Sequence, residues 1–356
     1  MKNEKLKGVD LFTGAGGLTL GFKKAGIVPI ASVEKNRDAF ETYKKHTPEG
    51  EHFCDDIVNV DLSKYRGKTH IVFGGPPCQP FSTGGLRKGR QDARDMLPAF
   101  LEVVRLLEPE VVFMENVPGL LVKSRINYLH EILDKISALG FHVSAKLLNA
   151  ADYGVPQKRR RLFIVGYRDK KFWFPRPTHG PGTKRDYVAS GVLISHEPLG
   201  EPPNCPVVYA KYPDLRPSPY AGHVYNGGGR PIDLSAPSPT ILASAGGYKT
   251  PWIDTLGIAV EYHKHLVSGG PPREGAVPGA RRLTAEESAL LQTFPRKIKF
   301  AGSRSSQYTQ IGDAVPPRLA EVLGREILKQ LNGAKPNAST HYVPEDYQQP
   351  LLCPEE

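Results

Sequence analysis

A cysteine and a glutamate each stand just past a short apolar run, at positions where chemistry can be expected. Cys78 follows the run 69–73 after a glycine and proline turn, and Glu115 follows the run 110–114. Such runs predict buried strands, and open α/β sheets do their chemistry at the carboxyl ends of their strands. If the two strands are parallel neighbours, one crevice holds both a thiol and a carboxyl group.

The surroundings of Cys78 favour a nucleophile over a core residue. A buried cysteine is most often only a small hydrophobe. This one, however, follows two prolines and precedes a glycine-rich basic loop that includes Arg87, Lys88 and Arg90. Nearby cations increase the reactive thiolate fraction of a cysteine. We therefore expect a rigidly placed nucleophile with a loop that can close over it.

A basic cluster at 157–161, QKRRR, runs into the apolar segment 162–165. In an extended chain Arg159 and Arg161 point to the same side, and Arg160 points to the opposite side. If the first two face the crevice, they bring positive charge to the substrate and the thiol. The alternative is a basic surface patch, to which we assign Arg160.

A third group of residues suggests a ligand that carries a nucleoside. The segment 10–17, DLFTGAGG, predicts a strand, a glycine turn and the start of a helix. It fails the dinucleotide fingerprint because Thr19 occupies the third glycine position, which disfavours nicotinamide and flavin cofactors. Glu34 ends the next predicted strand at a distance suited to ribose hydroxyls. Asp55 or Asp56, which follows a third strand, could meet an adenine.

These segments belong to an alternation of strand and helix patterns that predicts an α/β fold with a doubly wound, mostly parallel sheet. The predicted strands are 8–12, 29–33, 69–73, 110–114 and 162–167, and the predicted helices are 14–25, 93–107 and 316–331. Thr284 and Glu287 form a capping-box pattern that predicts one more helix.

Between about 174 and 279 the chain is rich in proline and glycine, and helical periodicity is lost. This pattern predicts a smaller second domain of loops and short strands. A disordered insertion is the alternative, but six tyrosine and tryptophan residues supply bulk for a core. We expect domains at 1–171, 172–280 and 281–332, the last returning to the first, with a tail at 333–356.

Composition narrows the class of protein. The 356 residues carry 47 Lys and Arg against 37 Asp and Glu, a net charge of +10 that favours polyanionic partners. The four cysteines form no C-x-x-C pair, which argues against a zinc site or a disulfide framework. With no signal-like or membrane-length apolar run, we expect a soluble, cytoplasmic protein without a metal.

Taken together, the motifs resemble those of the DNA (cytosine-5)-methyltransferases, and they appear in that family's order over about residues 8–330. The matching segments are DLFxGxGG at 10–17, GPPCQPFS at 75–82, ENV at 115–117, QxRxR at 157–161, RLT to FP at 282–295 and QIGDAVPP at 310–317. The Thr240-Ile241 pair looks like a doublet common in the family's target-recognition domain, which falls at about 172–280.

The resemblance implies the S-adenosylmethionine-dependent methyltransferase fold and the transfer of methyl from that donor to C5 of a cytosine flipped out of duplex DNA. Cys78 would attack C6, Glu115 would hold or protonate N3, and Arg159 and Arg161 would position the base. The product is S-adenosylhomocysteine. The donor would rest on Phe12, Gly14, Gly16, Glu34, Asp56, Ile57, Pro76, Leu97, Asp313 and Val315. The DNA would meet Gln79, Ser82, Arg87, Lys88, Arg90, Thr240 and Ile241.

Two positions depart from the family's pattern: Asp313 where many members have asparagine, and Lys35 where an aromatic residue often follows the ribose-binding acid. The resemblance is to a monomeric bacterial or phage enzyme, in a restriction-modification system or alone. One alternative keeps the mechanism but has tRNA as substrate. Another is a catalytically silent DNA-binding homologue, which would not need Cys78, Glu115 and both arginines.

Overall fold

The computed structural model describes residues 5–77, 95–220, 223–225 and 229–334. The chain forms two compact units. The first comprises Met1–Asn149, Arg160–Pro177 and Pro317–Glu356, and the second comprises Ala150–Arg159 and Thr178–Pro316. In this division residues 281–316 belong to the second unit, whereas the sequence analysis assigned them to the first domain. The predicted domain boundaries stay a prediction.

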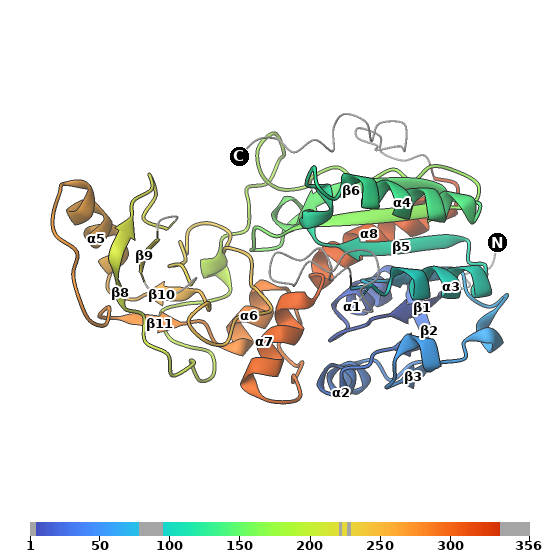
Figure 1. The fold of residues 1–356 in the computed structure, drawn as a ribbon, viewed down its shortest axis with the longest axis horizontal. Coiled ribbons are helices and arrows are strands. Elements are labelled where there is room, and N and C mark those ends of the chain that lie inside the picture. Colours follow the sequence, from blue (N-terminus) through green and yellow to red (C-terminus); the bar gives the residue numbers. More distant parts are fainter. Residues whose placement is uncertain (1–4, 78–94, 221–222, 226–228, 335–356) are drawn as a thin grey trace. The chain divides into compact units, whose positions relative to one another are not determined.

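The first unit is built on a seven-stranded sheet in the order β3-β2-β1-β4-β5-β7-β6. Figure 1 labels β1, β2, β3, β5 and β6 of this sheet. All neighbours are parallel except β7, which runs antiparallel to both β5 and β6. The mostly parallel sheet predicted from the sequence is confirmed. The strands are β1 (Leu6–Leu11), β2 (Ile27–Val33), β3 (Glu51–Phe53), β4 (Ile71–Gly74), β5 (Val111–Asn116), β6 (His142–Asn149) and β7 (Arg160–Tyr167).

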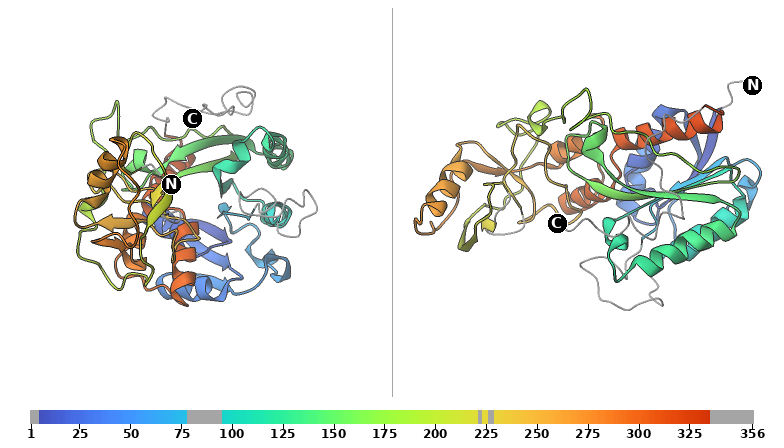
Figure 2. Two further views of the ribbon diagram at one scale, coloured as in Figure 1. Left: turned by 60° about the vertical axis from the view of Figure 1, so that its left-hand side comes forward. Right: turned by 90° about the horizontal axis from the view of Figure 1, so that it is seen from above.

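Helices cover both faces of this sheet, as Figure 2 shows for α4 and α8 on opposite sides. Strand alternation explains the two layers: Val72 and Val112 join the core under α3 and α4, whereas Phe73 and Phe113 pack against Phe22 of α1 in tilted and edge-to-face contacts. The helices of this unit are α1 (Gly17–Ala25), α2 (Arg37–His46), α3 (Leu97–Leu107), α4 (Ile126–Ala138) and α8 (Pro317–Leu331). Short 3-10 turns occupy Ile57–Asn59, Ser63–Tyr65 and Pro118–Leu121.

The second unit combines two small antiparallel sheets with short helices. Its strands are β8 (Tyr209–Asp214), β9 (His223–Tyr225), β10 (Trp252–Asp254) and β11 (Ala280–Arg282). Its helices are α5 (Ile258–Val267), α6 (Ala285–Leu291) and α7 (Arg304–Asp313), with 3-10 turns at Ala150–Tyr153 and Ser190–Val192. Fully buried Trp252 of β10 and Tyr262 of α5 lie in its core, as expected for a packed domain.

The expectation that this region lacks helices is wrong at α5. The helix begins after Gly257, and the Asp254 carboxylate accepts hydrogen bonds from the N–H groups of Ile258 and Ala259. These bonds satisfy donors that a helix start leaves without partners. A ten-residue helix set among glycine- and proline-rich segments gives too short an apolar repeat to be recognised in the sequence.

Candidate active site

Strand register lines up the predicted catalytic and cofactor residues of the first unit along one edge of its sheet. Leu11 of β1 pairs with Val33 of β2 and with Gly74 of β4, and Gly74 pairs in turn with Met114 of β5. The residues that follow are Phe12, Glu34, Gly75 and Glu115, so all four lie at the same edge. Because β7 is antiparallel, it begins there, with Arg160 and Arg161. We call this row of residues the carboxyl edge.

Glu115 and Arg161 form an ion pair at the carboxyl edge. Arg161 Nε lies 2.9 Å from Glu115 Oε1, and the two side chains are only 14% and 11% exposed. A Cβ atom built on Gly75 would lie 3.1 Å from Glu115 Oε2, so the glycine gives the carboxylate room. A charge-assisted bond of this kind orients a carboxylate firmly.

The turn that leads to Cys78 lies against Glu115. The Pro76 carbonyl accepts a hydrogen bond from Asn116 Nδ2 at 3.2 Å, and the Pro77 carbonyl accepts one from the Met96 N–H at 3.1 Å. The chain is therefore fixed by β5 and by the start of α3 up to the residue before the cysteine. Cys78 itself and the predicted DNA-contacting residues of the following loop lie outside the described residues: Gln79, Ser82, Arg87, Lys88 and Arg90.

The glycine turn after β1 has the geometry of a ligand cradle. Phe12, Gly14 and Gly16 all have positive φ, at 59°, 53° and 80°. A non-glycine residue in this region is strained, and such strain is common at functional sites. A Cβ atom on Gly14 would meet nothing within 4 Å, whereas one on Gly16 would lie 2.8 Å from the His46 ring. Gly14 thus faces open space, and Gly16 is required by its packing.

Glu34 fixes this turn from the end of β2. Its Oε2 accepts the Gly14 N–H at 2.8 Å, and its Oε1 accepts the Asn36 N–H at 2.7 Å. Burial raises the pKa of the carboxyl group, while the two backbone donors act in the opposite direction. Each carboxylate oxygen has a second lone pair, so the role predicted with ribose hydroxyls is compatible with these bonds.

Lys35, which departs from the family's pattern, lies near Asp56 on the adenine side of the predicted cofactor site. Lys35 Nζ lies 3.5 Å from Asp56 Oδ2, and the same carboxylate group caps the turn that begins at Ile57. The side chains of Ile57, Pro76 and Leu97 are buried. An ion pair therefore stands where an aromatic ring is often found.

Asp10, which the sequence analysis did not single out, is a buried carboxylate of β1 just before the glycine turn. It is 1% exposed, and its carboxylate accepts a hydrogen bond from the Thr19 hydroxyl, which also lies 3.3 Å from the Tyr43 hydroxyl. Burial raises the pKa of Asp10 well above its usual range. Thr19 thus has a partner, which explains why it replaces the third glycine of the fingerprint. The only sign of this bond in the sequence is the spacing of nine residues between the aspartate and the threonine.

Arg159 belongs to the second unit, whereas Arg161 belongs to the first. It is completely buried, and its guanidinium donates to the Ile241 carbonyl at 3.2 Å and to the Gly312 carbonyl at 2.7 Å. The expected alternation does not apply, because β7 begins only at Arg160. Arg160 is exposed, as expected. The predicted catalytic role of Arg159 stays a prediction.

The remaining predicted residues also lie in the second unit. The Thr240 hydroxyl donates to the Lys158 carbonyl at 2.6 Å, and Ile241 is completely buried. Asp313 ends α7, and Val315 is buried just beyond it. Among the described residues no cluster of His, Cys, Asp or Glu could hold a metal ion, and no described helix is long and apolar enough to span a membrane.

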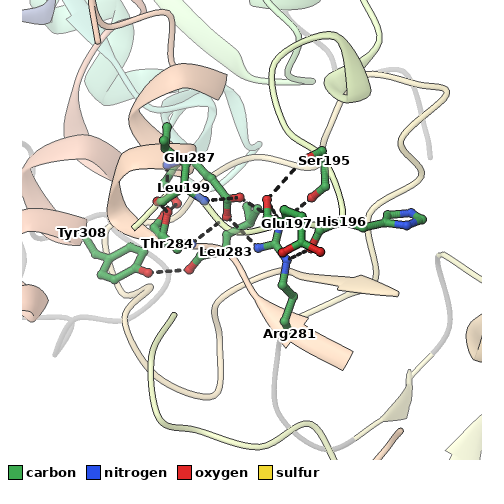
Figure 3. A network of polar contacts seen from close by, with 10 residues as sticks. Ser195, His196, Glu197, Leu199, Arg281, Leu283, Thr284, Glu287 and Tyr308 are labelled. Carbon is green, nitrogen blue, oxygen red and sulfur yellow. Dashed lines mark hydrogen bonds and ion pairs between the residues drawn. The ribbon is translucent and has the colours of Figure 1, made fainter. Parts of the chain in front are cut away.

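A second buried carboxylate and arginine pair lies in this unit (Figure 3). Arg281 of β11 donates to Glu287 of α6 from both terminal guanidinium nitrogens, at 2.9 and 2.8 Å. Glu287 also accepts the N–H groups of Thr284 and Leu199. The bonds between Thr284 and Glu287 confirm the predicted capping box. The Arg281 guanidinium donates further to carbonyls of 195–197, so the pair ties that loop to α6.

Known proteins share this fold. The chain aligns with crystal structures of a DNMT2 mutant of Spodoptera frugiperda and of the Dnmt2 methyltransferase of S. pombe, each with a TM-score of 0.66. The identities are 17% and 16%, and the alignments cover 90% and 92% of this chain and 99% and 100% of those proteins. The agreement confirms the predicted methyltransferase fold.

Sequence relatives are closer. The type II methyltransferase M.AplI of Arthrospira platensis is 36% identical, covering 94% of this chain and 88% of that protein. M1.HphI of Haemophilus parahaemolyticus is 32% identical, covering 90% and 86%. The model of the family described as C-5 cytosine-specific DNA methylase matches residues 6–191 and 239–329. The chain therefore belongs to the C-5 cytosine-specific DNA methylase family and is a DNA cytosine-5 methyltransferase.

Proposed function

We propose that this chain methylates C5 of a cytosine within a specific DNA sequence, through a transient covalent bond between Cys78 and C6. The observation that carries the proposal is the pair of Glu115 and Arg161 at the carboxyl edge, beside a turn that ends one residue before Cys78. Cys78 follows Pro77 directly in the sequence, and we propose that its thiol and the Glu115 carboxylate act on one base.

The proposed chemistry follows from the electronic structure of cytosine. C5 is a poor nucleophile until the Cys78 thiolate adds to C6, which moves electron density towards C5 and N3. Glu115 donates a proton or a hydrogen bond to N3, and Arg161 holds the carboxyl group in place. C5 then takes the methyl group, a base removes the C5 proton, and the Cys78 thiolate leaves as the C5–C6 double bond re-forms. Flipping exposes C6 at a cost of roughly a few kcal/mol.

Family membership and fold imply that the methyl donor is S-adenosylmethionine. The first unit offers residues that fit it: Gly14 faces open space, and Glu34 and Asp56 are acceptors suited to ribose and adenine. When bound, the donor supplies an electrophilic methyl group on a sulfonium. We assign Phe12, Gly16, Ile57, Pro76 and Leu97 to the same site. We assign Asp313 and Val315 to the cofactor side from the second unit.

DNA is the implied substrate, and we propose that the second unit reads its sequence. The net charge of +10 fits phosphate neutralisation, so affinity should fall steeply with salt. Thr240, with Gln79, Ser82 and the basic residues of the loop after Cys78, would contact DNA. Buried Ile241 would shape that surface from beneath. The type II names of the relatives support modification within a restriction-modification system. We expect a monomer.

The test is transfer of labelled methyl from S-adenosylmethionine to duplex DNA by the wild type and by Cys78→Ser. We expect methylated duplex with wild type and none with the variant. Bisulfite sequencing of DNA from a host that expresses the chain then identifies the target site. Full activity of Cys78→Ser would end the nucleophile assignment. Methylation of tRNA in preference to duplex DNA would change the substrate, and DNA binding without transfer would indicate a silent homologue.

A further inference from the structure

Three buried polar side chains of the second unit join segments that lie far apart in the sequence. They are Gln157, Arg159 and Gln292, which we call the polar hub. Arg159 donates to carbonyls 82 and 153 residues further along the chain, those of Ile241 and Gly312. Through this one side chain, the segment 240–243 and the segment 312–315 share a single planar group.

The two glutamines extend the same connection. Gln157 Oε1 accepts the Ile241 N–H at 2.9 Å, and its Nε2 donates to Gln292 Oε1 at 3.1 Å. Gln292 Nε2 in turn donates to the Ile311 carbonyl at 2.6 Å and to the Ala314 carbonyl at 3.4 Å. Both segments are thus held at two points each, once by an amide and once by Arg159.

The hub also completes the end of α7. The last carbonyls of a helix have no partner within the helix, and a cation there is favourable because it meets the negative end of the helix dipole. Arg159 and Gln292 supply donors to the carbonyls of Gly312 and Ile311. A Cβ atom on Gly312 would lie 2.3 Å from the Ala243 nitrogen, so the two segments pack backbone to backbone. Movement of one segment must therefore displace the other.

We propose that Arg159 is a positioning residue that couples DNA engagement at segment 240–243 to the cofactor-side segment 312–315. The inference rests on the proposed function, which assigns Thr240 to DNA and Asp313 and Val315 to the cofactor. The guanidinium is a rigid fork, so a shift of the Ile241 carbonyl reorients the bond to Gly312. Lysine keeps the charge but places one compact ammonium there, and it cannot preserve the geometry of both bonds.

The measurement is the dissociation constant of S-adenosylhomocysteine by calorimetry, with and without a duplex that carries the identified site. For the wild type we expect duplex to tighten binding by about tenfold, within the usual range of coupling between sites. For Arg159→Lys we expect the ratio to fall to about twofold or less, with binding in the absence of DNA largely kept. If Arg159 had only a structural role, its replacement would weaken S-adenosylhomocysteine binding equally with and without duplex, and the ratio of the two dissociation constants would not change.

Arg282→Lys is the matched control. Arg282 is also buried in the second unit and also donates to carbonyls, at 2.6 Å to Thr250 and 2.8 Å to Cys205. We expect its ratio to match the wild type. If Arg159→Lys does not fold, Gln292→Met removes a donor at the same helix end and should lower the ratio in the same direction.

The inference would be overturned if Arg159→Lys, or Gln292→Met in its place, kept the wild-type ratio of the dissociation constants without and with duplex. It would also be overturned if duplex did not change the affinity of the wild type for S-adenosylhomocysteine. An equal loss in Arg282→Lys would overturn it too, since any buried arginine would then serve. These results leave the methyltransferase proposal intact. That proposal fails separately if the wild type neither binds nor methylates DNA.

Discussion

Each unit buries a pair of a glutamate and an arginine, yet the two pairs are built differently. In the first unit Glu115 ends a strand and Arg161 begins its antiparallel neighbour, so the pair lies at a sheet edge. In the second unit Glu287 lies in the first turn of α6 and accepts hydrogen bonds from both terminal guanidinium nitrogens of Arg281. The Glu115 side chain is 11% exposed and the Glu287 side chain 1%.

We interpret this difference as separating a carboxylate that takes part in the proposed chemistry from one that is structural. A carboxylate accepts about four hydrogen bonds, and Glu287 receives four, from Thr284, Leu199 and Arg281. Glu287 therefore cannot accept a further hydrogen bond from a substrate, and its bonds hold the 195–199 loop on α6. Glu115 stands instead beside a glycine that leaves it room and beside the turn that leads to Cys78. Burial with an arginine is common to both pairs, and location distinguishes them.

The largest effect expected is loss of activity in Glu115→Gln. The amide keeps the shape of the side chain but cannot give a proton to N3, so kcat should fall by about 10²- to 10⁴-fold. The free energy of unfolding should fall by only about 1 kcal/mol, because the pair is at an edge and the amide oxygen can still accept from Arg161. Methyl transfer under saturating substrates and urea unfolding give the two numbers. A stable variant with wild-type kcat would remove Glu115 from the mechanism.

Glu287→Gln should show the reverse. Removal of one charge from a buried pair leaves the other uncompensated, at a cost of about 3 kcal/mol in the free energy of unfolding. Activity per folded molecule should stay within about twofold of the wild type, since Glu287 contacts no proposed substrate group. Urea unfolding and an active-site titration would measure these effects. A large fall in kcat with unchanged stability would make the two pairs equivalent and defeat the comparison.

Asp10 provides a pH test, since its Oδ1 has no hydrogen-bond partner although the atom is buried. Burial raises its pKa in the folded state. Its contribution to stability is therefore complete below the unfolded-state pKa and is lost as the pH rises through the folded-state pKa. Relative to Asp10→Asn, the wild type should lose stability as the pH rises above about 4, by at most about 1.4 kcal/mol per pH unit.

Asp61→Asn is the control for this measurement. The Asp61 carboxylate accepts the Ser63 N–H, which lowers its pKa from the ordinary value. Its contribution is lost only as the pH falls through that lowered value, so the difference from wild type should be flat between pH 5 and 8. Urea unfolding across this range compares both variants. A flat profile for Asp10→Asn would mean that the carboxyl group does not change its protonation within that range.

The carboxyl edge could be predicted because its signals are local. Glu115 and Glu34 follow apolar runs that read as strands, and parallel neighbouring strands end at the same edge. The pair with Arg161 follows once β7 is placed beside β5. The bond between Asp10 and Thr19 was missed because a polar residue within a strand pattern carries no sign of its buried hydrogen-bond partner.

The second unit was less predictable because its contacts are not local. Arg159 was expected to act with Arg161, but its acceptors at Ile241 and Gly312 lie 82 and 153 residues away. Periodicity says nothing about such bonds, since they depend on how loops return to one another. The family model also skips residues 192–238, which include β8 and the loop held by Arg281.

The smallest effect expected is that of Thr284→Ala. The hydroxyl accepts the Glu287 N–H at 3.0 Å and donates to the Leu199 carbonyl at 2.6 Å, so it joins the cap of α6 to the loop. Its loss should cost about 1 kcal/mol in the free energy of unfolding, and Thr284→Ser should restore most of it. Because the Glu287 and Arg281 pair remains, activity should not change. If Thr284→Ala instead weakened methylation at the target site without destabilising the fold, the network would serve recognition, and its saturated carboxylate would no longer mark it as structural.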